Sequence, residues 1–183
     1  MLTYGSIAFL SVFASGLILL LVKIPRNPMK MLLAFSGAFL FAMSLLHLIP
    51  ELYTNGGAQV GIWILVGFLI QLLLEFVSEG IEHGHVHNHD DHHHDKSKVP
   101  IGIITGLCLH SFLEGMPLGV HTTSNEIFTP FLTGIVLHNI PVAIAFMGIL
   151  LHHGNSKTRA AMWLMLFAIM TPLGMIAANL AGA

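Results

Sequence analysis

The chain is poor in charged residues and has almost no cysteine. Only 9% of its 183 residues are charged and 55% are hydrophobic, whereas about a quarter of the residues are charged in an ordinary soluble domain. That balance excludes a typical soluble domain and indicates a protein embedded in the lipid bilayer. Cys108 is the only cysteine, so neither a disulfide framework nor a thiolate zinc cluster can form within one chain.

Cations are also scarce, because lysine and arginine together number seven while histidine numbers 13. A chain that is rich in histidine without being basic is not expected to bind nucleic acid. The histidines point to metal instead, which would have to bind through imidazole, carboxylate and carbonyl groups. No H-E-x-x-H pattern occurs, which disfavours a membrane metalloprotease, and we expect no enzyme activity.

Long apolar stretches dominate the sequence, and six of them suit helices of roughly 20 residues that cross about 30 Å of hydrocarbon. The sequence therefore predicts an all-α, polytopic transmembrane helical bundle that forms a single domain over residues 1–183. The turn residues at 55–57 should reverse the chain after the second span. The six predicted spans are residues 4–23, 30–52, 59–81, 99–120, 127–151 and 159–181.

The positions of the cations predict how the chain is oriented in the membrane. Lysine and arginine accumulate on the cytoplasmic side, and all seven lie in or beside the first, third and fifth connections. We therefore expect an integral protein of the plasma or inner membrane whose N-terminus faces outward. The third connection, residues 83–98, would then be a cytoplasmic loop.

That third connection is rich in histidine. Seven histidines and three aspartates fall between residues 83 and 95. Such a tract captures divalent transition metals weakly and flexibly, because imidazole is a good ligand and nothing fixes the geometry. A solvated linker is the other interpretation, and the two are compatible. The histidines are His83, His85, His87, His89, His92, His93 and His94.

A histidine and a carboxylate share one face of the fourth span. Residues at i and i+4 lie on the same side of a helix, so His110 and Glu114 can approach one ion. A central carboxylate costs roughly 2.5 to 3.5 kcal/mol on insertion scales, so Glu114 should have a partner or a water-filled path. A hydrogen bond that only holds two helices together is the alternative.

His138 in the fifth span should lie at the same depth as His110. His110 lies as many residues before the short connection as His138 lies after it. Because each helix rises about 1.5 Å per residue, the two histidines should be equally far from that connection. His110, Glu114 and His138 would then form the two-histidine, one-carboxylate shell typical of open zinc sites. Taken alone, His138 could equally be a neutral imidazole bonded to a carbonyl.

Two prolines and a second histidine–carboxylate pair could also matter. Pro141 cannot donate to the carbonyl of the residue four positions back, so a kink and an unsatisfied oxygen are predicted beside His138. Pro117 could loosen the fourth span in the same way, or either kink could only fit neighbouring helices. His47 and Glu51 repeat the four-residue spacing near the outer end of the second span, as a relay for an ion or as an interfacial polar pair.

The histidines of the fifth span allow a second interpretation of the function. His138 and His152 are 14 positions apart on one predicted helix, a separation that bis-histidine haem pairs can have. A membrane haem protein is therefore an alternative to a metal-ion site.

Several of these motifs together resemble the ZIP (Zrt/Irt-like) family of divalent metal transporters. The fourth span carries HSFLEG where that family has H-N-x-x-[DE]-G. The fifth carries HNIPVA where the family has a histidine or glutamine, a polar residue, a proline and an acid. The second span's HLIPEL, the histidine-rich loop and the sixth span's TPLG agree with the family pattern.

The resemblance implies a transport domain that moves a divalent metal toward the cytoplasm. The metal is the substrate, zinc first, with iron, manganese, cadmium or cobalt as other candidates. His110, Glu114 and His138 would fall on the family's primary metal position, and Ser111 and Asn139 on a neighbouring one. A non-transporting metal sensor or partner subunit is the alternative, and a homodimer is an assembly to be tested.

This sequence departs from the family pattern at three points. Family members usually have eight spans, so six spans would make this chain a reduced or C-terminally truncated member. Val142 stands where the family has an acid in the fifth span, and Ser111 stands where asparagine is usual. A site with one carboxylate should bind its ion more weakly and release it more easily.

Overall fold

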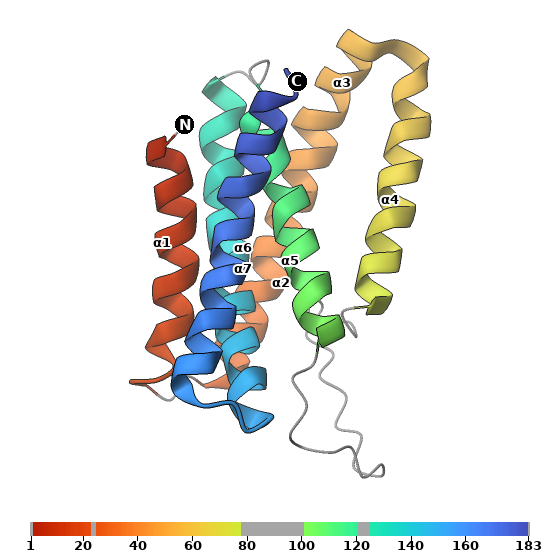
Figure 1. Cartoon of the computed structure of the whole chain (residues 1–183). Coiled ribbons are helices and arrows are strands. Elements are labelled where there is room, and N and C mark those ends of the chain that lie inside the picture. Colours follow the sequence, from red (N-terminus) through yellow and green to blue (C-terminus); the bar gives the residue numbers. More distant parts are fainter. Residues whose placement is uncertain (1, 23–24, 78–100, 121–124, 183) are drawn as a thin grey trace.

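The computed structural model describes residues 2–22, 25–77, 101–120 and 125–182, and in these the chain forms helices and no strand. The all-α prediction is confirmed. The helices lie side by side as a bundle, and α1 begins at the end where α7 finishes (Figure 1). They are α1 (Leu2–Ile18), α2 (Arg26–Met43), α3 (Ile49–Gly56), α4 (Val60–Val77), α5 (Ile101–Gly115), α6 (Asn125–His152) and α7 (Lys157–Leu180), with the short helices η1 (Ser44–Leu48), η2 (Gly57–Gln59) and η4 (Met116–Gly119).

Within the part of the chain that the structure describes, four helical segments are long and apolar enough to cross a membrane, rather than the six predicted. The difference arises because the segment Asn27–Leu74 counts as one, although the chain reverses within it at Gly57, whose φ is 65°. Positive φ suits glycine, and the reversal falls in the predicted turn. The shorter apolar helix Thr3–Ile18 is not among the four. Six helical passes therefore cross the bundle.

The prolines change the helix type in two places. The α-helix of α5 ends at Gly115 and tightens into the 3₁₀-helix η4, which contains Pro117. Before Pro50 the chain forms the π-helix η1, where the N–H of Ile49 bonds to the carbonyl of Ser44. Since proline has no N–H for the usual α-helical bond, a change of hydrogen-bonding pattern beside it is expected. α6 continues as a helix through Pro141, and the predicted kink there stays a prediction.

Two apolar clusters fill the bundle, one toward each end. The loop-side cluster lies near the connection between α6 and α7, and the terminus-side cluster near the end where α7 finishes. Between them, the buried residues of α5, α6 and α7 are polar, glycine or proline, and the buried polar ones, which we call the polar layer, are Ser111, His138, Asn139 and Thr171. The buried members of the loop-side cluster are Val12, Ile103, Ile104, Leu107, Cys108, Val142, Ala143, Phe146, Met147, Leu150, Ala160, Leu164, Phe167 and Ala168, and those of the terminus-side cluster are Leu118, Phe131, Leu132, Ile135 and Met175.

Glycines let α5 and η4 approach α7 with backbone against backbone. A Cβ atom on Gly115 would overlap the carbonyl oxygen of Thr171, and one on Gly174 would overlap that of Phe112. Gly119, four residues after Gly115, is equally close to the carbonyl of Met175. Small residues at this spacing are typical of close helix pairs in membranes. The pair fixes the height at which the polar residues of α5 meet those of α7.

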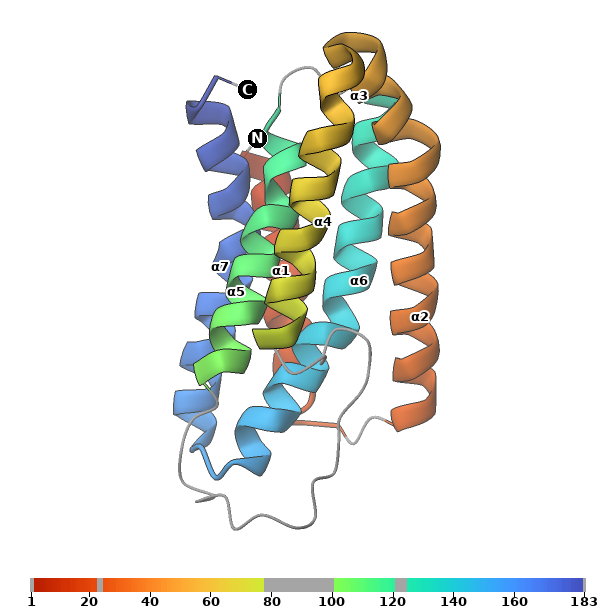
Figure 2. The ribbon, with the colours of Figure 1, turned by 90° about the vertical axis from the view of Figure 1, so that its right-hand side faces the viewer.

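α4 lies at the edge of the bundle, beside α5 (Figures 1 and 2). Most of its described side chains are exposed, and Leu74 alone among them is buried. Exposed apolar side chains are expected on a helix that faces lipid. The histidine-rich loop, residues 83–98, lies outside the described residues.

Candidate metal centre

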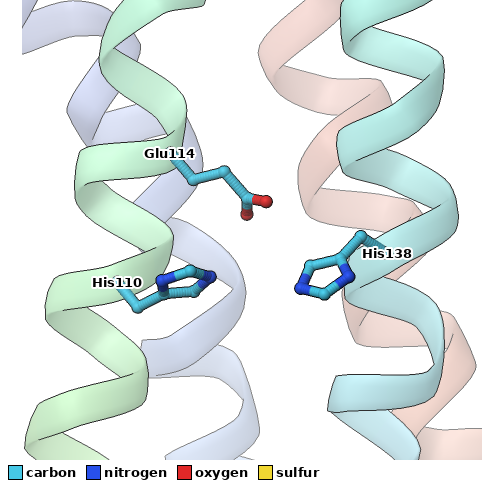
Figure 3. Close-up of side chains that lie close together, drawn as sticks. All are labelled: His110, Glu114 and His138. Carbon is cyan, nitrogen blue, oxygen red and sulfur yellow. The ribbon is translucent and has the colours of Figure 1, made fainter. Parts of the chain in front are cut away.

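His110, Glu114 and His138 form one compact group of potential metal ligands. One ligand atom from each residue lies within 4.8 Å of the others. The two histidines face each other across the gap between α5 and α6, and the Glu114 carboxylate points toward the same space (Figure 3). The imidazole centroids are 6.2 Å apart. The helical spacing and the equal depth predicted from the sequence therefore bring these three side chains together.

The group lies in the polar layer between the two apolar clusters. On α6, His138 comes between Ile135 of the terminus-side cluster and Val142 of the loop-side cluster. His138 is only 8% exposed, and His110 and Glu114 are half-buried. Apolar packing on both sides lowers the local dielectric and strengthens any interaction of these groups with a cation.

Asn139 fixes the carboxylate of Glu114. Its side-chain Nδ2 donates a hydrogen bond of 2.9 Å to Oε2 of Glu114. Asn139 is 1% exposed, and its Oδ1 has no hydrogen-bond partner among the described residues. A carboxylate held by a neutral amide keeps its negative charge for a cation, whereas a lysine or arginine partner would neutralise it.

Each histidine of the group has a partner at Nδ1 that the sequence did not single out. The hydroxyl of Ser36 on α2 lies 3.4 Å from Nδ1 of His138. The amide of Gln71 on α4 lies 3.1 Å from Nδ1 of His110 through its Nε2 atom. Such partners orient metal-binding imidazoles and direct the other ring nitrogen, Nε2, at the ion.

Ser111 bonds to α7 and is not part of the three-residue group. Its hydroxyl oxygen lies 2.8 Å from that of Thr171, and both residues are fully buried. The bond joins α5 to α7 beside the close glycine contacts. A neighbouring metal position at Ser111 and Asn139 stays a prediction.

Three polar residues around the site were missed from the sequence: Ser36, Gln71 and Thr171. Gln71 is the one amide in the otherwise apolar central part of α4, and Ser36 is the one hydroxyl within α2. A single polar residue inside an apolar span is itself a signal, since it seldom faces lipid. Thr171 belongs to the TPLG stretch, for which no role was predicted.

Other candidates lie apart from the group. His47 is exposed in the π-helix η1, and Glu51 is half-buried in α3. Val142, at the position where an acid would be expected from the resemblance, packs in the loop-side cluster at 2% exposure. The seven loop histidines fall outside the described residues.

Fold and site together define a polytopic helical membrane protein with a cluster of potential metal ligands at mid-depth. A model of the ZIP zinc transporter family matches residues 78–182, more than half of the chain. The chain belongs to that family, whose members are divalent metal transporters and not enzymes. No curated protein and no solved structure gives a match to this chain.

Proposed function

We propose that the chain carries zinc across the membrane toward the cytoplasm through a site formed by His110, Glu114 and His138. The observation that carries this proposal is the meeting of three ligand atoms within 4.8 Å of one another. Two imidazoles and one carboxylate match the ligands of open zinc sites, which leave a further position for water or an incoming group.

The surroundings of the site favour passage over permanent binding. Glu114 is the one acid in the group, so a doubly charged ion keeps about one net positive charge. Transport requires binding that is favourable enough for entrance and weak enough for release. The apolar clusters on both sides would exclude water while the ion is held, and each must open in turn for the ion to pass.

The direction of transport is inferred from the cations. Arg26 and Lys157 are the first residues of α2 and α7, and both helices start at the end of the bundle opposite to the end of α7 (Figure 1). Cations mark the cytoplasmic side. The histidine-rich loop would then be cytoplasmic, where its imidazoles can capture the released ion.

His47 and Glu51 would lie toward the outer side in this orientation. The π-helix at His47 is a local irregularity of a kind that is frequent at functional sites. We propose that this pair is a relay on the route to the centre. A relay has to lie outside the ligand group, and neither residue belongs to that group.

The test is zinc uptake into proteoliposomes with Glu114→Gln. Glutamine keeps an oxygen to accept the Asn139 hydrogen bond and removes only the charge. We expect saturable uptake in the wild type, its loss in Glu114→Gln, and retention in the control His152→Gln, which changes an exposed histidine at the end of α6.

Three outcomes would contradict the proposal. Equal uptake by Glu114→Gln and the wild type would remove this site from the route. Zinc binding that depends on Glu114 without any flux would support a non-transporting metal sensor or partner subunit. A Soret band in the purified protein would support the haem alternative instead.

A further inference from the structure

The two histidines of the site differ in how their Nδ1 atoms are held. For His110, both atoms of one amide lie within reach of the same ring nitrogen. Nε2 of Gln71 is 3.1 Å from Nδ1 of His110, and Oε1 of Gln71 is 3.3 Å from it. The same pair can therefore form a hydrogen bond in either direction.

The direction of that bond decides which tautomer His110 adopts. A neutral imidazole has one N–H and one lone pair. If the amide oxygen faces Nδ1, the ring carries its proton on Nδ1 and presents a lone pair at Nε2. If the amide nitrogen faces Nδ1, the proton is on Nε2 and that nitrogen cannot bind a metal.

His138 faces a hydroxyl instead of an amide. Oγ of Ser36 lies 3.4 Å from Nδ1 of His138 and 3.1 Å from the carbonyl oxygen of Leu33, which can only accept. While the hydroxyl donates to that carbonyl, it accepts from Nδ1–H of His138 and leaves the lone pair on Nε2.

We propose that Gln71 is a positioning residue that selects the metal-binding tautomer of His110. Rotation of its amide by half a turn changes His110 between a ligand and a non-ligand. The inference rests on the proposed function of the His110, Glu114 and His138 group, and it adds a residue from α4 that touches no metal itself.

The proposal connects the edge helix to the loading of the site. α4 has few buried side chains, and Gln71 lies on the side of the helix that faces α5. A movement of α4 that draws the amide oxygen away from Nδ1 would release His110 from its ligand tautomer. Metal occupancy and the position of α4 are coupled in this way.

The first test is zinc affinity in the full-length chain whose seven loop histidines are replaced by serine, so that the loop does not bind zinc. Gln71→Leu removes the amide and should weaken zinc binding about 10- to 100-fold, the usual effect of losing a partner of a ligand histidine. Gln71→Glu supplies only acceptor oxygens and should bind zinc at least as tightly as glutamine. The control Gln59→Leu changes an exposed residue of η2 and should have no effect.

The second test reads the tautomer directly and needs no metal. Nitrogen-15 NMR of histidine-labelled protein, with His110 assigned by its loss in His110→Gln, reports which ring nitrogen carries the proton. Gln71→Glu should place it entirely on Nδ1, whereas the wild type and Gln71→Leu should retain a fraction protonated on Nε2. A bond that only ties α4 to α5 would not move this signal between glutamine and glutamate.

The results separate the two proposals. The role of Gln71 is overturned if Gln71→Leu binds zinc with wild-type affinity, or if Gln71→Glu leaves the tautomer of His110 unchanged. In either case the proposed function still stands as long as Glu114→Gln abolishes uptake. If Glu114→Gln leaves uptake intact, the proposed function fails, and the tautomer shift remains measurable in the metal-free protein.

Discussion

α4 and α6 are both long apolar helices, yet only α6 is buried. α4 is the more apolar of the two but exposes most of its side chains, while α6 packs against α1, α2 and α7. Lipid tails are as apolar as leucine, so hydrophobicity does not draw a helix into the centre of a membrane protein. Small and polar side chains do, and in α6 these include His138 and Asn139.

The same contrast separates the parts of the molecule that carry the site. α5 and α6 supply the proposed ligands, α5 and α7 form the close glycine packing, and the hydroxyls of Ser111 and Thr171 bond across this packing. α2 and α4 each add one polar side chain to a ligand histidine from outside. We therefore expect substitutions in the first part to act on folding and binding, and those in the second to tune binding.

The largest effect is expected from the glycine contact between α5 and α7. Gly174→Ala would force a methyl group into the carbonyl of Phe112, and overpacking of this kind typically costs about 1–3 kcal/mol, occasionally more. Thermal unfolding in detergent, followed by size-exclusion chromatography, should show loss of folded protein.

Its matched control is Gly67→Ala on α4, where no atom lies within 4 Å of an added Cβ. Alanine favours a helix over glycine by about 1 kcal/mol, so this variant should be as stable as the wild type or slightly more so. Equal destabilisation by the two changes would break the distinction between a packed centre and a lipid-facing edge.

An effect on zinc binding rather than on folding is expected from His138, one of the proposed ligands. His138→Ala removes one of three ligands, so zinc affinity should fall by more than the roughly 10- to 100-fold seen for outer partners. The fold should survive, because the change only shortens one side chain in the polar layer. Isothermal titration with the loop histidines replaced measures the affinity.

His47→Ala, in the π-helix η1 that follows α2, is the control for His138→Ala. His47 is exposed in η1 and lies outside the ligand group, so equilibrium affinity should not change. A slower initial rate of uptake with unchanged affinity would support the relay, whereas unchanged uptake would favour an interfacial polar pair.

The smallest effect is expected at Ser36. Ser36→Ala removes the hydroxyl that lies 3.4 Å from Nδ1 of His138, and zinc affinity should fall by about tenfold, the low end for such partners. The control Ser11→Ala also loses a hydroxyl bonded to a carbonyl three residues back, but it lies on α1, which contributes no residue to the His110, Glu114 and His138 group. A similar loss of affinity in both would show that Ser36 acts through helix stability rather than through His138.

The spans and the proximity of the three potential ligands followed from local rules. Apolar length placed all six passes to within a few residues of the described helices, and the i, i+4 spacing with a symmetric connection brought His110, Glu114 and His138 together. These features depend on periodicity and helix rise, which a single sequence carries.

The partners of the ligands could not be predicted in the same way. Gln71 meets His110 across 39 positions and Ser36 meets His138 across 102, and such contacts depend on how the helices rotate about their axes. In lipid that rotation is set by packing and not by an apolar face. Likewise, the sequence shows a valine instead of an acid at position 142, but only the fold shows that Val142 packs in the loop-side cluster.

The central claim is that zinc binds between α5 and α6. Anomalous diffraction at the zinc edge, from crystals of the full-length protein loaded with zinc, locates the ion without reference to any assay. We predict a peak about 2 Å from one nitrogen each of His110 and His138 and from an oxygen of Glu114. A zinc-bound structure with no peak in this group, or with peaks only elsewhere in the chain, would contradict the account.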